Sequence, residues 1–214
     1  MGEGPDPLRD LIMAFLPRHL TEASADSVFA GLGLAPGLIA TIDSNAYSGL
    51  TRRDPTSGSI SLMLNESLTK ARAPSILAHE MAHVQQFKGL NEEEAVEGRP
   101  GPDPAFVGIQ NIFEGRYADM STAERAKALE WYLEGTLTPE EYAQRQEMSL
   151  ERLLSNPSVK REIQAEAVQR GFDHVRQLSQ KPKEEVLKSL GELDNVLPGS
   201  RAAFNLFLRR LNDG

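Results

Sequence analysis

The chain has 214 residues, of which 40% are hydrophobic and 25% are charged, as in folded globular proteins long enough to bury a core. Its formal net charge of -8 argues against a nucleic-acid-binding protein, which needs a basic face, and against attraction to anionic lipid. Because the chain has no cysteine, disulfides and thiolate metal sites are excluded, and any metal must be held by His, Asp or Glu.

The N-terminal segment is expected to form two short helices. Asp6 and Pro7 suit the start of the first helix, and the second follows Thr21. The apolar run from Leu11 to Leu16 is too short to span a bilayer, and the residues before it are more acidic than basic. We therefore expect no signal peptide and no membrane insertion, in a cytoplasmic or particle-associated protein.

Residues 37–64 change in character. Residues 38–42 and 60–64 are rich in Leu and Ile and suit strands, and the turn-rich residues 54–58 lie between them. This pattern predicts a small antiparallel sheet of two or three strands.

The best-marked helix covers residues 75–88. Pro74 suits its first turn, Gly89 suits its end, and no helix breaker lies between them. The chain then becomes acidic and loop-like over residues 92–104, which forms the clearest internal boundary.

Helix-start signals continue beyond this boundary. Residues 121–124 form a capping-box pattern, residues 138–141 repeat it, and Asn156-Pro157 opens another helix. Two more amphipathic segments follow Pro182 and are separated at Pro198-Gly199.

The predicted fold class is α+β and mainly α, with a small antiparallel sheet beside the helix over residues 75–88. Residues 1–90 would hold the N-terminal helices, the sheet and this helix. Residues 91–214 would form a helical subdomain with a C-terminal extension, and both parts would make one compact unit.

The predicted helix carries His-Glu-Met-Ala-His at residues 79–83. Because residues four apart share one helix face, His79 and His83 can aim two imidazole nitrogens at one Zn²⁺ ion. Glu80 flanks the metal without closing its coordination, so it can take a proton from metal-activated water and pass it to the leaving amine. The motif predicts hydrolysis of peptide bonds, with Glu80 as general base.

A structural histidine pair on an amphipathic helix is the alternative interpretation of this motif. Ile76, Leu77, Val84 and Phe87 make the rest of the helix apolar, which indicates that it is buried. Buried His and Glu side chains need a partner, so we favour a metal site.

A catalytic zinc site needs a third protein ligand. No histidine follows His83 at short spacing, which favours a distant carboxylate. Glu162 is the best candidate, because Glu166 lies one helical turn further and can accept the N–H of a ligand imidazole. A solvated acidic pair on a surface helix is the alternative, but Ala165 and Ala167 favour close helix contact. The other candidate ligands are Glu166, Glu114, Glu130 and Glu134.

Residues 77–86, Leu-Ala-His-Glu-Met-Ala-His-Val-Gln-Gln, resemble the motif helix of the gluzincin zinc peptidases. The likeness is greatest to the metallopeptidase-like domain associated with extracellular contractile injection systems, whose motif also ends in Val-Gln-Gln. The order of the predicted elements before the motif, strand, turn-rich stretch and second strand, is also similar, so the resemblance covers residues 37–90.

The resemblance also extends to the third ligand. Gluzincins take it from a Glu on a later helix with an acid four residues beyond, a spacing that Glu162 and Glu166 match. Residues 162–166 also resemble the corresponding segment of the CAAX-processing membrane peptidases, whose membrane helices this chain lacks. The usual second acid is Asp, so the role of Glu166 carries over less directly than that of Glu162.

A peptidase also needs a group that stabilises the tetrahedral oxyanion and a surface that holds the substrate. Gluzincin substrates often add to an edge strand beside the motif helix, so by analogy residues 60–64 would line the cleft. The candidates for the oxyanion group are Tyr117, Tyr132, Tyr142 and His174.

The function predicted is that of a zinc-dependent peptidase acting on protein or peptide substrates. The alternative is a zinc-stabilised structural or assembly component of a larger, phage-like or injection-system-like particle, without proteolytic activity. In that case the helical residues 105–214 would offer a surface to partner proteins, although the apolar residues 204–211 fit ordinary core packing.

Overall fold

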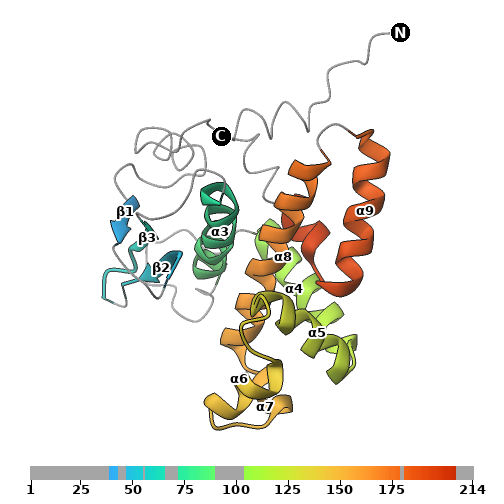
Figure 1. The fold of residues 1–214 in the computed structure, drawn as a ribbon. Helices are drawn as coiled ribbons and strands as arrows, with labels where there is room; N and C mark the ends of the chain where they lie inside the picture. The colour runs from blue at the N-terminus through green and yellow to red at the C-terminus, as the bar shows by residue number, and fades with distance from the viewer. Residues whose placement is uncertain are drawn as a thin grey trace.

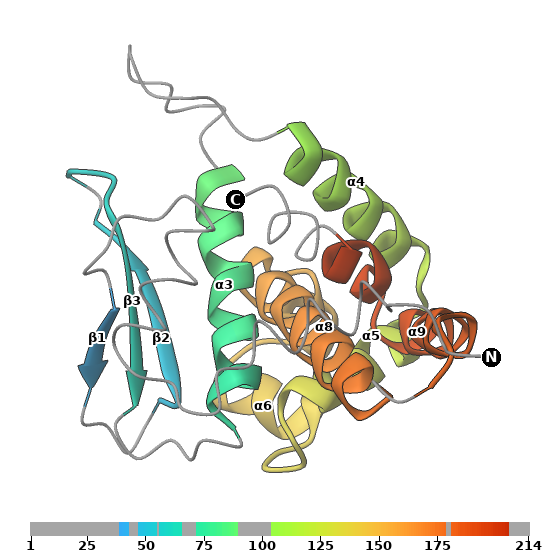
Figure 2. The ribbon, with the colours of Figure 1, turned by 90° about the horizontal axis from the view of Figure 1, so that it is seen from above.

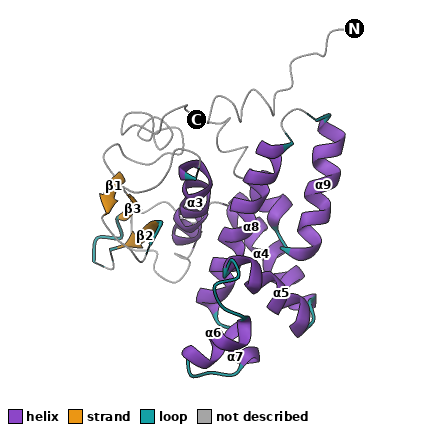
Figure 3. Ribbon diagram, viewed as in Figure 1, coloured by secondary structure: helices purple, strands orange, loops and turns teal. Residues whose placement is uncertain are grey.

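The computed structural model describes residues 39–42, 47–54, 56–65, 72–89, 104–178 and 181–205. The predicted N-terminal helices, the loop before Pro104 and the apolar chain end after Asn205 lie outside these residues. Over the described residues the chain is mainly helical with one small sheet, which confirms the α+β, mainly α fold class (Figure 1, Figure 3).

The sheet has three strands in the spatial order β1-β3-β2: β1 (Ile39–Ile42), β3 (Ile60–Asn65) and β2 (Gly49–Arg53). β2 and β3 pair antiparallel, but β1 pairs parallel to β3, against the antiparallel arrangement expected for these two segments. The cause is β2, which the sequence pattern did not reveal. The chain reverses into β2 and again into β3, so β1 and β3 point the same way and β2 takes an edge.

The predicted turn joins β2 to β3. The Asp54 carboxylate accepts the backbone N–H groups of Thr56 and Ser57, each at 2.7 Å. Gly58 has a φ of 70°, a left-handed conformation that favours glycine. The turn thereby sets the register in which β2 meets β3.

Helix α3 (Ala73–Gly89) lies between the sheet and helix α8 (Pro157–Gln177), as Figure 2 shows. It matches the predicted helix and is covered on two sides, which explains why most of its described side chains are buried. Ala82 of α3 shares a buried cluster with Ala165 and Val168 of α8. The small side chains of the two alanines allow the helices to approach closely.

The remaining helices surround α8. Both predicted capping boxes are formed, at Ser121 and at Thr138, and α8 begins at Pro157 as predicted. Gly199 adopts a φ of 85° in the turn that follows the last of these helices. They are α4 (Pro104–Asp119), α5 (Thr122–Tyr132), α6 (Pro139–Arg145), α7 (Leu150–Leu154) and α9 (Lys183–Val196).

A large buried cluster lies between α4, α5, α6, α7 and α8. Phe113 and Tyr117 are its largest members, and the Tyr117 hydroxyl donates to the backbone oxygen of Leu154 at 2.9 Å. Ile163 of α8 is fully buried in the same cluster. Because Ile163 follows Glu162 directly, this packing fixes the rotation of α8 and with it the direction of the Glu162 side chain.

Candidate metal centre

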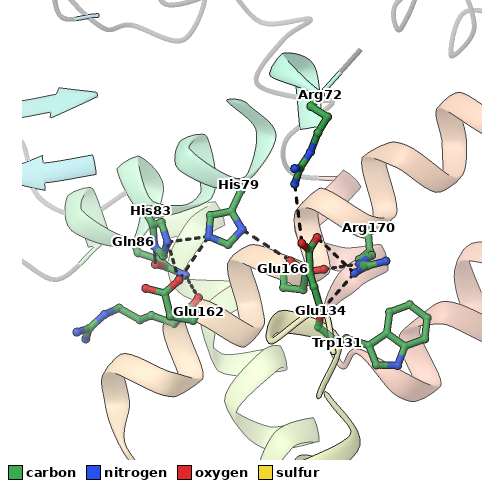
Figure 4. A network of polar contacts seen from close by, with 10 residues as sticks. Arg72, His79, His83, Gln86, Trp131, Glu134, Glu162, Glu166 and Arg170 are labelled. Carbon is green, nitrogen blue, oxygen red and sulfur yellow. Dashed lines mark hydrogen bonds and ion pairs between the residues drawn. The ribbon is translucent and has the colours of Figure 1, made fainter. Parts of the chain in front are cut away.

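Three side chains from α3 and α8 converge at one point (Figure 4). His79 Nε2 and His83 Nε2 lie 3.2 Å apart on adjacent turns of α3. Glu162 Oε2, from α8, lies 3.4 Å from His79 Nε2 and 3.2 Å from His83 Nε2. His79, His83 and Glu162 form a group, among the described residues, that can hold a metal ion.

The size of this triangle can be compared with what zinc requires. With metal–ligand bonds of about 2.0–2.1 Å, neighbouring ligand atoms of a tetrahedral site are separated by about 3.3 Å. The three separations at the site are 3.2, 3.2 and 3.4 Å. Two imidazoles and one carboxylate are also a donor set that hydrolytic zinc sites use. The residues therefore fit a zinc ion in both spacing and chemistry.

A glutamine orients His83. The side-chain amide of Gln86 donates to the backbone oxygen of Arg161 at 3.0 Å and to Gln164 Oε1 at 3.1 Å. Its own oxygen therefore faces His83 Nδ1, at 2.8 Å, and accepts the N–H there. This leaves the lone pair of His83 Nε2 free for a metal. The sequence prediction did not assign this role to Gln86, although a glutamine about one turn beyond a ligand histidine on an otherwise apolar helix is a usable signal.

Glu166 lies beside His79, but it does not make the predicted hydrogen bond. Its Oε2 is 4.0 Å from His79 Nδ1, which is buried and has no hydrogen-bond partner among the described residues. Glu166 instead forms an ion pair with Arg170, one turn further along α8. Arg170 also donates to the backbone oxygen of Trp131 at 3.2 Å and lies 3.9 Å from Glu134 (Figure 4).

The charges at the site support one another. Burial alone would raise the pKa of Glu162, but hydrogen bonds and charges from His79 and His83 outweigh it and lower the pKa to about 2. Burial alone would lower the pKa of His83, but the hydrogen bond and charge of Glu162 raise it above its usual value. Burial raises the pKa of Glu166, and Arg170 opposes that effect. Glu162 is therefore available as an anion throughout the neutral range.

Glu80 is held by the edge strand β2. Its side chain is buried, and its Oε2 accepts the Thr51 hydroxyl at 2.7 Å. The same hydroxyl lies 3.2 Å from the backbone oxygen of Glu80. A Cβ added to Gly49 would lie 2.7 Å from Glu80 Cγ and Oε1, so a side chain at this position would displace the Glu80 carboxylate. The sequence did not predict the contacts of Gly49 and Thr51 with Glu80, because these residues are about 30 positions apart and no local pattern relates them.

A cavity of about 540 Å³ opens over these side chains. His79, Glu80, His83 and Glu162 all line it, together with residues 47–51, which lead into and form part of β2. The prediction that residues 60–64 line the cleft is wrong. β3 is the central strand, paired on both sides, and β2 occupies the edge beside the cavity.

Three of the four candidate oxyanion groups are engaged elsewhere. Tyr117 is buried and donates to Leu154, and Tyr142 packs against the same hydrophobic cluster without lining the cavity. His174 Nε2 lies 2.6 Å from the hydroxyl of Ser189, and neither residue lines the cavity.

Tyr132 is the candidate that lines the cavity. Its ring stacks on the ring of His79, with centroids 6.4 Å apart and an interplanar angle of 18°. Burial, followed by the charge of Glu162, raises the pKa of Tyr132, so its hydroxyl stays protonated at neutral pH. Tyr132 can therefore donate a hydrogen bond into the site.

The alternative carboxylate ligands do not join the histidines. Glu114 binds Lys160 at 3.0 Å, and Glu130 binds Lys127 at 2.8 Å. Glu134 lines the cavity but lies 3.8 Å from Arg72.

The chain has no significant match among protein-family models, curated proteins or solved structures. None of the described helices combines the length and the apolar character needed to cross a membrane. The chemistry of the site is therefore inferred from its own residues.

Proposed function

We propose that the chain is a zinc-dependent peptidase, with His79, His83 and Glu162 as the metal ligands and Glu80 as the general base. The observation that carries the proposal is the convergence of three donor atoms within 3.4 Å of one another. The second support is Glu80, which shares one open cavity with them. A purely structural metal site is closed by protein ligands and needs neither feature.

When bound, zinc supplies Lewis acidity, which polarises a carbonyl oxygen and lowers the pKa of water. Glu80 takes the proton of the attacking water and delivers it to the nitrogen of the leaving amine. Its hydrogen bond with Thr51 holds the carboxylate in place for both transfers. Tyr132, stacked on His79, donates a hydrogen bond to the oxyanion that develops on the substrate carbonyl.

The edge of β2 suits an extended peptide. β3 is the strand that pairs with β2 among the described residues, so residues 49–51 of β2 can offer their other edge to a peptide strand. A substrate strand added there would gain main-chain hydrogen bonds along residues 49–51, next to Glu80. Main-chain pairing depends little on side chains and would leave selectivity to the rest of the cavity.

Elemental analysis and a casein cleavage assay test the proposal. We expect about one zinc ion per chain, and cleavage that stops on chelation and returns when zinc is restored. A chain without stoichiometric zinc would overturn the proposal. Stoichiometric zinc without cleavage would favour a structural role for the metal.

Thr51→Val is expected to lower kcat by about tenfold while KM changes by less than about twofold, since the lost hydrogen bond positions a charged base. Thr51→Ser keeps the hydroxyl and should retain most of the activity. Steady-state kinetics on a fluorogenic peptide, with zinc content measured for each variant, checks the effect. Equal losses in the Ser and Val variants would argue that Thr51 acts through strand packing instead.

Zinc affinity is expected to be constant at high pH and to fall as the pH drops through the raised pKa of His83. The metal-free site holds a proton on His83 below that pKa, and zinc must displace it. Glu162 imposes no such competition, because its pKa is about 2. Competition with a chelator between about pH 5 and 9 measures the change. A decline in affinity that began only near pH 4, where ordinary carboxylates protonate, would contradict the assignment of the proton competition to His83.

A further inference from the structure

Arg161 lines the cavity and directly precedes Glu162 on α8. Its backbone oxygen accepts the Gln86 amide at 3.0 Å, which places it beside the C-terminal half of α3. Its guanidinium donates to the Ser158 hydroxyl at 3.0 Å, and Ser158 and Phe87 line the same cavity. Arg161 is thus anchored through its backbone and carries a charged side chain at the cavity wall.

The guanidinium of Arg161 has no carboxylate within ion-pair distance among the described residues. Glu162 is adjacent in sequence, but its carboxylate faces the two histidines. Arg72, which also lines the cavity, lies 3.8 Å from Glu134. A guanidinium has five N–H donors and Ser158 takes only one, so Arg161 can still bind an anion. Arg161 therefore presents to the cavity N–H donors that no carboxylate of the described residues occupies.

The position of Arg161 limits where that anion can lie on a substrate. Gln86 is about one helical turn beyond His83, so the backbone of Arg161 lies on that side of the two histidines. An extended peptide advances about 3.3 Å per residue. Because Arg161 and the three metal ligands line one cavity, the anionic group belongs to a residue near the cleaved bond.

Resting on the proposed function, we propose that Arg161, with Ser158 and Phe87, forms a carboxylate subsite for the peptide substrate. The planar guanidinium binds a carboxylate through two parallel hydrogen bonds, and Phe87 adds apolar surface to the same cavity. The carboxylate can come from an Asp or Glu side chain or from the C-terminus of the peptide. The enzyme is accordingly selective for acidic sites or for chain ends.

Equilibrium binding to the zinc-loaded full-length Glu80→Gln variant tests the subsite without cleavage. The probes are short fluorescent peptides, made as Glu and Gln pairs at each position, with free or amidated C-termini. We expect the carboxylate form of one pair to bind about tenfold more tightly than its amide form. Preference in a Glu and Gln pair identifies a side chain, whereas preference for a free over an amidated end identifies the C-terminus.

Three variants of the same protein locate the effect. Arg161→Gln should abolish the carboxylate preference without weakening the amide peptides, and Arg161→Lys should retain part of it. Arg72→Gln removes the same charge at the other end of α3 and should leave the preference intact. A preference that survives Arg161→Gln, equal binding of every pair, or no binding at all would overturn the subsite.

Cleavage of the same peptides by the wild-type protein separates this proposal from the one on which it rests. Cleavage without carboxylate preference would overturn the subsite and leave the peptidase intact. Carboxylate-selective binding that depends on Arg161, without cleavage of any peptide, would support the subsite and overturn the peptidase.

Discussion

Replacing Glu80 by Gln is expected to lower kcat for peptide cleavage by about 10²- to 10⁴-fold, the range that positioned proton transfer contributes. The zinc content should not change, because Glu80 is not among the three converging donors. Gln is close in shape to Glu, and its amide oxygen can still accept the Thr51 hydroxyl that now bonds the carboxylate at 2.7 Å. The loss would therefore report the missing base and not a displaced strand.

The measurement combines kcat on a fluorogenic peptide with zinc analysis of the same preparation. Glu130→Gln is a matched control, since Glu130 is exposed and pairs with Lys127 on the surface. Unchanged cleavage by Glu80→Gln would exclude Glu80 as the base. Zinc at full occupancy with no cleavage by either protein would favour the structural or assembly role.

Replacing Glu162 by Ala is expected to weaken zinc binding by more than about a hundredfold, beyond what the loss of an outer hydrogen-bond partner costs. The variant keeps His79 and His83, which make only two corners of the site. Removing the carboxylate also leaves the raised pKa of His83 without its main support, so protons compete less strongly. That smaller effect opposes the loss but does not replace a ligand.

Competition with a chelating dye at fixed pH measures this loss, and circular dichroism checks that the helices remain. Glu114→Ala is the matched control, because Glu114 was an alternative ligand from sequence and instead pairs with Lys160 at 3.0 Å. Full zinc occupancy in Glu162→Ala would show that the third ligand lies elsewhere. A parallel loss in Glu114→Ala would point to a general fault in folding.

The sequence by itself determined the local features of this protein. The helix over residues 75–88, the capping boxes at Ser121 and Thr138 and the start of α8 at Pro157 all appear as predicted. Each depends on hydrogen bonds and side-chain spacing within a few residues, which the local sequence records. The spacing of His79 and His83 is local in the same sense, and so is that of Glu162 and Glu166.

Only the tertiary structure decided what surrounds these motifs. β2 was missed because its sequence, Gly-Leu-Thr-Arg-Arg, lacks the apolar alternation of a half-buried strand, as an edge strand beside a cavity can. Its position made β1 parallel to β3 and placed Thr51 against Glu80, 29 residues away. The contact of Gln86 with Arg161 spans 75 residues.

The assignment of Glu162 depends on both the local sequence and the tertiary structure. Its sequence neighbours made it a candidate, but other carboxylates of this acidic chain remained open. The buried packing of Ile163 sets the rotation of α8, so that the Glu162 carboxylate faces the two histidines. Glu114 and Glu130 instead form ion pairs with lysines. Contacts between distant segments depend on the path of the whole chain, which no local pattern encodes.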